Sequence, residues 1–176
     1  SNRINEMPFE DQQLLRYASM NGPEFYIEEL SLGLNRDEIE IIDKLESIQK
    51  TTRPAIIIDD PYKSQAYYFR TNLSWSVLNE KSYYNGQNGG RKTEPANNYH
   101  KRIVLHAVKN IDLLEIPLQK VLFHCMEYKP NGQKYFPTIF LALLEQYRKK
   151  KVWGTIDEDI GRYEKYASQE YTVEQQ

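Results

Sequence analysis

The spacing of apolar residues changes from helical to strand-like near residue 52, and this change constrains the fold more than any other feature. Upstream, apolar residues recur every three or four positions over residues 9–20, 23–32 and 35–49, a spacing that places them on one face of a helix. Downstream, two short runs rich in β-branched and aromatic residues, 55–58 and 65–70, are typical of strands. We therefore expect three helices followed by two strands.

Turn residues mark the boundaries of these elements. Asn21-Gly22-Pro23 ends the first helix, because Asn or Gly can take a left-handed cap and Pro cannot continue a helix. Gly33 is expected to end the second helix. Asn35, with Glu38 three residues later, predicts the start of the third. Asp59-Asp60-Pro61 is turn chemistry that joins the two strands into a hairpin.

Three helices followed by a hairpin are the element order of a winged helix, and we predict a winged-helix-like unit over residues 1–78. Residues 79–98 are rich in Asn, Gly and basic residues, which predicts a flexible basic loop or linker. Residues 99–176 are expected to form a helical unit with a frayed C-terminal tail. Helical spacing within it covers residues 99–109, 117–126 and 137–151. The expected fold class is α+β and mainly helical.

The chain has a single cysteine, Cys125, among 176 residues, so no disulfide can form within it. A single cysteine favours a reducing compartment, and we therefore expect an intracellular protein, cytoplasmic or nuclear. The longest apolar runs fall far short of the roughly 20 residues that span a bilayer, so no membrane association is expected. Hydrophobic residues make up 40% of the chain, which is enough to bury a core.

The net charge of -2 hides an uneven distribution. Residues 1–80 hold 8 basic and 14 acidic side chains, whereas residues 81–109 hold 6 basic and 1 acidic. A DNA-reading helix meets phosphates through Lys and Arg, but the third predicted helix, which occupies the recognition position, is acidic. Protein binding suits this helix better, although its acids are equally typical of a solvated face. The candidate protein-binding residues are Asp37, Glu38, Glu40, Asp43 and Tyr67.

Basic and aromatic residues alternate where the predicted linker meets the second helical unit. Arg and Lys bind phosphates and aromatic rings stack on bases, so this stretch is a candidate nucleic-acid contact. Its residues are Arg91, Lys92, Tyr99, His100, Lys101 and Arg102. A solvated basic linker explains the same residues. A second basic run, 148–151, is typical of a helix C-terminus, where the helix dipole favours cations.

Residues suited to catalysis or metal binding form no recognisable pattern. His100, His106, His124 and Cys125 lack the paired spacing of a structural zinc site, so no metal is expected. Cys125 lies in an apolar stretch, which predicts a buried structural thiol. The sequence contains no glycine-rich phosphate loop and no nucleophile elbow, so neither a cofactor nor an enzymatic activity is expected.

The expected function is a non-catalytic interaction or adaptor module, or an accessory subunit of a larger assembly, such as one that processes nucleic acid. The expected partner is another protein or a second copy of the chain. The first alternative is direct binding of DNA or RNA through the wing and residues 91–102. The second is an enzyme whose active site is formed by residues distant in the sequence.

Overall fold

The computed structural model describes residues 2–83, 94–150 and 161 of the 176-residue chain. These residues are mostly helical and include a small antiparallel sheet in the strand order β1-β3-β2. The helices are α1 (Asn2–Glu6), α2 (Phe9–Ser19), α3 (Ile27–Leu34), α4 (Glu38–Thr51), α5 (Asn72–Tyr83), α6 (Glu94–Lys109), α7 (Leu118–Glu127) and α8 (Phe136–Lys150). The strands are β1 (Glu24–Tyr26), β2 (Ile57–Asp59) and β3 (Ala66–Phe69), and the 3-10 helices are η1 (Ile111–Leu113) and η2 (Asn131–Tyr135). The expected α+β, mainly helical class is confirmed.

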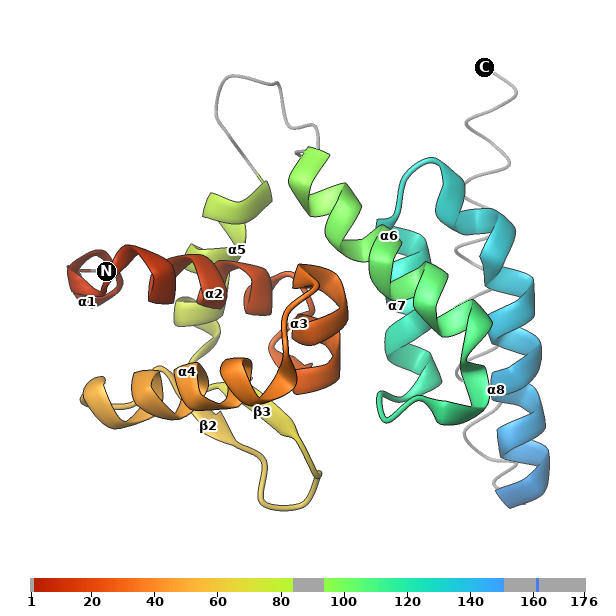
Figure 1. Cartoon of the computed structure of the whole chain (residues 1–176), viewed down its shortest axis with the longest axis horizontal. Coiled ribbons are helices and arrows are strands. Elements are labelled where there is room, and N and C mark those ends of the chain that lie inside the picture. The colour runs from red at the N-terminus through yellow and green to blue at the C-terminus, as the bar shows by residue number, and fades with distance from the viewer. Residues whose placement is uncertain (1, 84–93, 151–160, 162–176) are drawn as a thin grey trace.

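Helices α2, α3 and α4 and the sheet share one core in the N-terminal half (Figure 1). Helix α4 shows how the sequence pattern produces it, because Ile41, Leu45 and Ile48 follow at helical spacing and are each 1% exposed or less. Burying each such side chain contributes about 1.5–3 kcal/mol. Asp37 caps the helix, since its carboxylate accepts a hydrogen bond from Ile39 N at 2.9 Å.

Residues 24–26 form strand β1, and the prediction that they begin the second helix was wrong. Phe25 pairs with Tyr67 of β3, and its fully buried ring lies 5.5 Å from that of Phe69. The backbone is extended here because β3 offers it hydrogen bonds and a buried aromatic contact, and such tertiary pairing overrides a local helical pattern. Helix α3 begins only at Ile27. The predicted hairpin is present as β2 and β3, and β1 adds a third strand to it.

The connection between α3 and α4 also differs from the prediction. Gly33 lies inside α3, and Asn35 takes the left-handed cap conformation with a φ of 55°. Asp37, rather than Asn35, is the N-cap of α4. Gly33 serves a different purpose, because the Tyr99 ring of α6 packs on it and a Cβ there would lie 2.1 Å from Tyr99 Cε2. The close approach of α6 to α3 therefore requires glycine.

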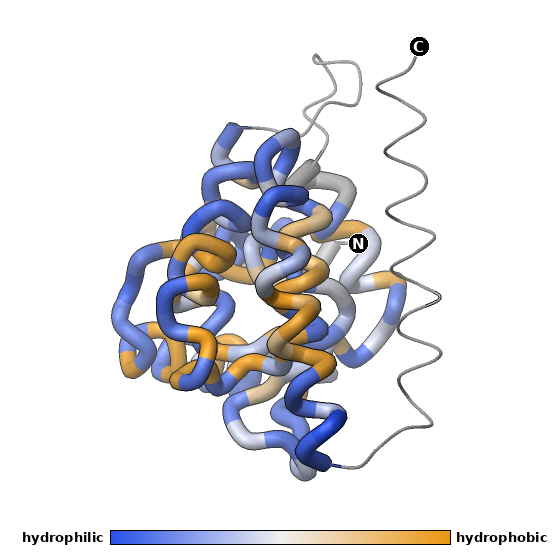
Figure 2. The backbone as a smooth tube through the Cα atoms, turned by 90° about the vertical axis from the view of Figure 1, so that its right-hand side faces the viewer, coloured by the Kyte–Doolittle hydropathy of each residue, from blue (hydrophilic) through white to orange (hydrophobic). Residues whose placement is uncertain are grey.

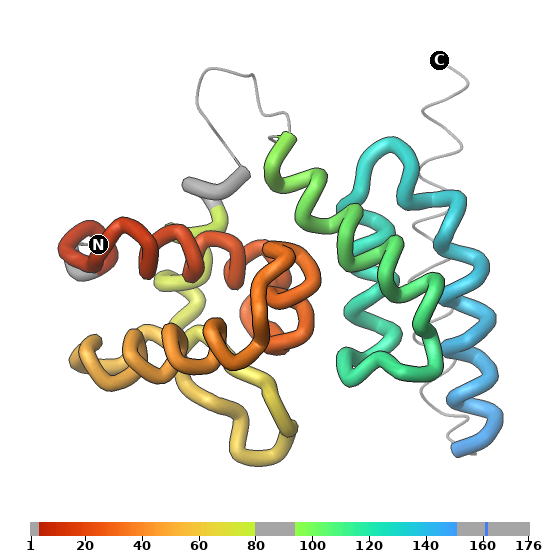
Figure 3. Tube along the Cα trace, viewed as in Figure 1, coloured from red at the N-terminus to blue at the C-terminus, as the bar shows by residue number. Residues whose placement is uncertain are grey.

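The C-terminal half contains the three helices predicted there, as α6, α7 and α8 (Figure 3). Helix α6 begins at Glu94, so residues 94–98 of the predicted linker are helical, and residues 79–83 belong to α5. Helix α5, which packs along α2, has no counterpart among the predicted elements. Residues 84–93 of the predicted linker lie outside the described residues, as do residues 151–160 and 162–176, which include the predicted frayed tail.

Helix α3 connects the two halves, with α4 on one side and α6 on the other (Figure 1). At the far end of the molecule, α8 carries hydrophobic residues along its length and a hydrophilic end (Figure 2), which is the predicted basic C-terminus. Ile139 and Leu143 of α8 are buried, whereas Leu141 is 64% exposed. Within the described ranges, no helix is both long and apolar enough to cross a membrane.

Candidate functional site

Three titratable side chains from three helices meet at the buried junction between the two halves. Glu29 of α3, His100 of α6 and His124 of α7 are each 0% exposed. His124 lies between the other two, because its Nε2 is 2.9 Å from Glu29 Oε1 and its Nδ1 is 2.8 Å from His100 Nδ1. We call these residues the junction triad. They form a continuous hydrogen-bond chain from α3 through α7 to α6.

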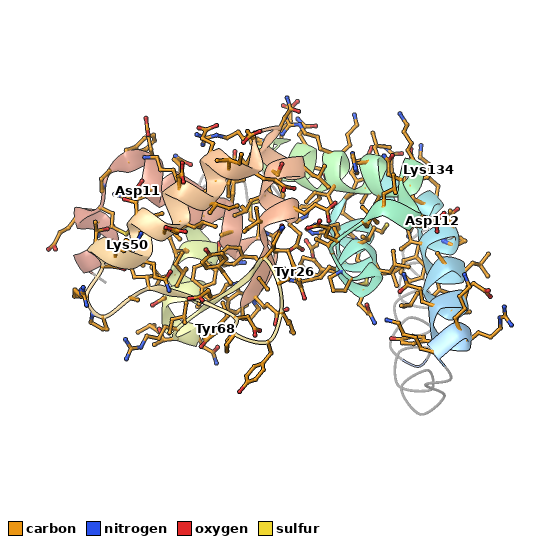
Figure 4. All side chains as sticks on the ribbon, turned by 60° about the horizontal axis from the view of Figure 1, so that its bottom comes forward. Asp11, Tyr26, Lys50, Tyr68, Asp112 and Lys134 are labelled. Carbon is orange, nitrogen blue, oxygen red and sulfur yellow. The ribbon has the colours of Figure 1, made fainter. Side chains whose placement is uncertain are left out.

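Glu29 is held in place by two further groups. Its Oε2 accepts a hydrogen bond at 2.7 Å from the backbone N–H of Tyr26, a residue near the middle of the molecule (Figure 4). On the other side, Lys120 Nζ of α7 lies 3.7 Å from Glu29 Oε1. Burial raises the pKa of Glu29 to about 7, while Lys120 and the Tyr26 N–H oppose the shift. Near neutral pH the carboxyl group is therefore protonated part of the time.

Polar groups around the triad are also paired. Lys120 Nζ donates to Asn21 O at 2.7 Å and to Glu24 O. The Tyr99 hydroxyl lies 2.9 Å from Asn21 Oδ1 and 3.1 Å from Glu29 O. Because a buried polar group without a partner is costly, a network paired in this way favours one relative placement of the helices over others.

Two contacts at the edge of the junction reinforce it. Arg102 Nη1 of α6 donates to Gly33 O of α3 at 2.6 Å. Glu28 Oε2 of α3 accepts hydrogen bonds from Glu115 N and Ile116 N, both at 2.8 Å, in the segment between α6 and α7. Of the two consecutive glutamates of α3, Glu29 contacts α6 and α7, and Glu28 contacts the segment that connects them.

The residues predicted to bind nucleic acid do not form one surface among those described. Tyr99 and His100 are fully buried, so their rings are not available to stack on bases. Arg102 is used in the contact with Gly33, and Lys101 is exposed. Arg91 and Lys92 lie outside the described residues. The aromatic part of the predicted contact belongs to the core.

The acidic face of α4 lies at the surface as predicted. Asp37, Glu40 and Asp43 are exposed and Glu38 is half-buried. Ile39, in the middle of these acids, is 69% exposed. We call these five residues the α4 face.

Each basic side chain of residues 36–50 is paired with a carboxylate. Arg36 pairs with Glu40, and Lys50 pairs with Glu46 at 2.9 Å. Lys44 reaches back to α2, where its Nζ lies 3.3 Å from a carboxylate oxygen of Glu10 and 3.3 Å from one of Asp11. These cations are therefore engaged within the protein, and the α4 face presents negative charge around an apolar side chain.

Carboxylates from other segments extend the α4 face. Burial raises the pKa of Glu38, and the neighbouring carboxylates Glu115, Glu28 and Asp37 raise it further. The remaining predicted contact, Tyr67, is 7% exposed and stacks on Phe25 with ring centroids 5.9 Å apart, so it belongs to the core. The protein-binding candidates are thus reduced to the acids of α4.

An open pocket of about 250 Å³ lies beside the N-terminal end of α4. Phe9, at its rim, is 69% exposed, which is unusual for so large an apolar side chain. The residues that line the pocket are Phe9, Glu10, Gln13, Leu14, Tyr17, Leu34 and Arg36. The pocket is below the usual range for small-molecule sites, which is roughly 300–1,000 Å³, and is the size of one or two side chains.

Sequence reasoning missed the junction triad. The sequence did offer one signal, because Glu29 occupies a core-facing position of an otherwise apolar helix face with Leu30 and Ile27 beside it. A charged residue at such a position is rarely buried unless it is paired. His124 is a similar case on α7, next to Leu122 and Cys125. Which partner each one finds depends on the tertiary packing.

Among the described residues, no group of three or more His, Cys, Asp and Glu side chains is placed to hold a metal ion. The three side chains of the junction triad are closed to solvent. No protein-family model, curated protein or solved structure matches the chain, so its function has to be inferred from this geometry.

Proposed function

We propose that the chain is a non-catalytic protein-interaction module, an adaptor or accessory subunit of a larger assembly, that binds a basic protein partner through the α4 face. In this proposal residues 1–78 form the winged-helix-like unit, whose characteristic helices and strands lie within residues 9–69. Its support is the element order α2-β1-α3-α4-β2-β3 and the strand order β1-β3-β2, which match a helix–strand–helix–helix–hairpin unit. Helix α4 then occupies the position that reads the major groove in DNA-binding relatives of this architecture.

The observation that carries the proposal is the charge state of α4. Residues 36–50 hold 3 basic and 5 acidic side chains, and all three cations are paired with carboxylates. Such a helix repels phosphate but attracts Lys and Arg on a protein surface. Ile39 and the adjoining pocket supply apolar contacts next to that charge. The partner expected is therefore a basic protein segment that presents one or two apolar side chains.

Direct nucleic-acid binding has less support. The proposed contact needed Tyr99 and His100 at the surface, and both are buried. At the tip of the β2–β3 loop, Tyr62 is 94% exposed, but the neighbouring Lys63 pairs with Glu24 at 2.6 Å. A phosphate-binding wing needs cations that are available to the ligand.

The test is affinity capture with the full-length chain and a charge-reversed α4 variant, Glu38→Lys/Glu40→Lys/Asp43→Lys. Proteins retained by the wild-type chain in 100 mM salt would be compared with those retained by the variant. A control variant with the same change of charge on α1, α6 and α8, Glu6→Lys/Glu94→Lys/Glu145→Lys, separates the effect of the α4 face from that of net charge. Light scattering on each chain distinguishes a second copy from a different partner.

We expect a partner that the wild-type chain and the control both retain and that the α4 variant loses by at least tenfold. Substituting Ile39→Ser alone should also weaken this retention, because a contact centred on Ile39 buries its side chain. The same proteins retained equally by the wild-type chain and the α4 variant would overturn the proposal. Binding of a DNA duplex at 50 mM salt that is lost at 200 mM would favour the nucleic-acid alternative instead.

A further inference from the structure

The geometry of the junction triad allows a single hydrogen between its two imidazole rings. The nitrogens that face one another, His100 Nδ1 and His124 Nδ1, are 2.8 Å apart, and both rings are fully buried. At this distance one nitrogen must donate and the other must accept. The protonation of one ring therefore dictates that of the other.

We propose that Glu29, His124 and His100 form a proton-operated latch that holds α6 against α7 beside α3. The latch stays closed while the triad holds at most one added proton and opens when both rings are charged. The proposal is independent of the α4 face. It concerns only how firmly α6 is held against α7 at different pH.

Two closed states of the latch can be drawn without moving any atom other than hydrogen. In the first, the Glu29 carboxylate accepts from His124 Nε2–H, and His124 Nδ1 accepts from His100 Nδ1–H. When one proton is added, it lies in the hydrogen bond between Glu29 Oε1 and His124 Nε2, on either atom, while His124 Nδ1 donates to His100 Nδ1 and the hydrogen of His100 moves to its Nε2. Every short contact of the triad is preserved in both states.

A second proton cannot be accommodated in this geometry. It places a hydrogen on both facing nitrogens and two positive rings side by side in a site without water contact. Of the groups around the site, Lys120 adds a third cation, while Glu29 and Glu24 supply negative charge. The ionisable side chains that act on the triad among the described residues are Glu24 of β1, Tyr26, Tyr99 of α6 and Lys120 of α7. Because the two rings belong to α6 and α7, this repulsion favours separation of α6 from α7, while Glu29 of α3 keeps its attraction to charged His124.

The sign of the pH effect follows from the number of protons that each state binds. With the pKa of Glu29 raised to about 7, the closed latch holds its one added proton near neutrality. Histidine in an unfolded chain titrates near pH 6.5, so an open junction binds two protons below about pH 6. The closed state binds one proton fewer than the open state, and acid therefore opens the junction. A difference of one proton changes the opening equilibrium by about tenfold per pH unit.

Hydrogen exchange of the full-length protein measures this opening directly. Exchange of the α6 and α7 amides would be followed by mass spectrometry from pH 7.5 to pH 5, corrected for the intrinsic pH dependence of exchange. We expect the opening constant to rise by about tenfold per pH unit below about pH 6. In His100→Asn, whose amide can occupy the place of Nδ1 but takes no charge, this slope should fall to near zero.

The third histidine of the chain provides a matched control. His106 also lies on α6 but is exposed, outside the buried triad. His106→Asn should therefore keep the wild-type slope. Equal slopes in the wild-type chain and His100→Asn would overturn the proposal.

Nitrogen-15 spectra of the histidine rings give a second measurement that needs no variant. Between pH 7.5 and pH 6 the folded protein should move from a proton on His100 Nδ1 to one on His100 Nε2, as the hydrogen between the rings transfers to His124. If both rings become fully charged while the α6 and α7 amides keep their protection, the latch does not exist.

Discussion

Replacing Glu29 by glutamine tests the electrostatic account of the junction most directly. Glu29 is 0% exposed, and burial raises its pKa from the ordinary 4.5 to about 7. The protonated carboxyl is therefore the form that the folded protein favours. Its stabilising effect is present in full below pH 4.5 and is lost as the pH rises through 7. Glutamine has the same shape and remains neutral throughout, with its Oε1 able to accept from Tyr26 N and its amide able to donate to His124.

The free-energy cost of ionised Glu29 in the folded protein follows from the size of its pKa shift. Raising the pKa from 4.5 to about 7 is a change of roughly 2.5 units, and each unit is worth about 1.36 kcal/mol. Ionised Glu29 therefore costs the folded protein about 3 kcal/mol at pH 8. Urea denaturation of Glu29→Gln and the wild-type chain at several pH values would measure this cost. The free energy of unfolding of the variant, relative to wild type, should rise by about 2–3 kcal/mol between pH 5 and pH 8.

A surface substitution of the same kind serves as the control. Glu115 is exposed, and Glu115→Gln should follow the wild-type free energy of unfolding to within about 0.5 kcal/mol at every pH. The reasoning is refuted if the difference between Glu29→Gln and wild type stays constant from pH 5 to pH 8. That result would mean that Glu29 keeps an ordinary pKa in the folded protein.

Three further substitutions or reactions test the packing around the junction. Gly33→Ala should lower the free energy of unfolding in urea by about 1–3 kcal/mol, because the new Cβ would meet the Tyr99 ring at 2.1 Å; the stabilisation usual for alanine in a helix would contradict this close packing. Tyr99→Phe should cost about 1–2 kcal/mol in the same assay, since Asn21 Oδ1 loses its contact with the hydroxyl, and an unchanged midpoint would show that the contact contributes nothing. Cys125, whose pKa burial raises to about 12, should react with a thiol reagent at pH 8 at least tenfold more slowly in the folded than in the urea-unfolded chain, and equal rates would show that α7 is open.

Most helices could be predicted from the sequence because their apolar residues follow one face. In α4, for example, Ile41, Leu45 and Ile48 supply the whole buried stripe. Helix α5 has no such stripe. It is held in part by polar contacts, since Trp75 Nε1 and Asn79 Nδ2 both donate to Ser19 O at 2.8 Å. A contact between residues nearly 60 positions apart leaves no periodic signal, and α5 was missed for this reason.

The two candidate sites differ in how far the sequence could show them. The acids of α4 lie together along one helix, so counting charges was enough to find them. The junction triad brings together Glu29, His100 and His124 from three helices, and nothing local to any of these residues indicates the others. His100 was even assigned to a surface, because a histidine beside Lys101 and Arg102 has the composition of a phosphate contact. Burial of a polar side chain is a tertiary property, and composition alone does not determine it.

The α4 face and the latch both contact α3, so opening the latch would alter the surface beside α4. Glu28 and Glu29 are consecutive residues of α3. Glu29 belongs to the latch, while Glu28 holds Glu115 N and Ile116 N and, with Glu115, raises the pKa of Glu38 on α4. Opening the junction would therefore remove Glu115 from the acidic surface that we propose binds a basic partner. Because linkage is reciprocal, a partner that prefers the closed arrangement must bind more weakly in acid and must also protect the α6 and α7 amides from exchange. If the partner's affinity does not change between pH 7.5 and pH 5.5, under conditions in which the junction is shown to open, the latch does not affect binding at the α4 face. It would then change only the stability of the junction.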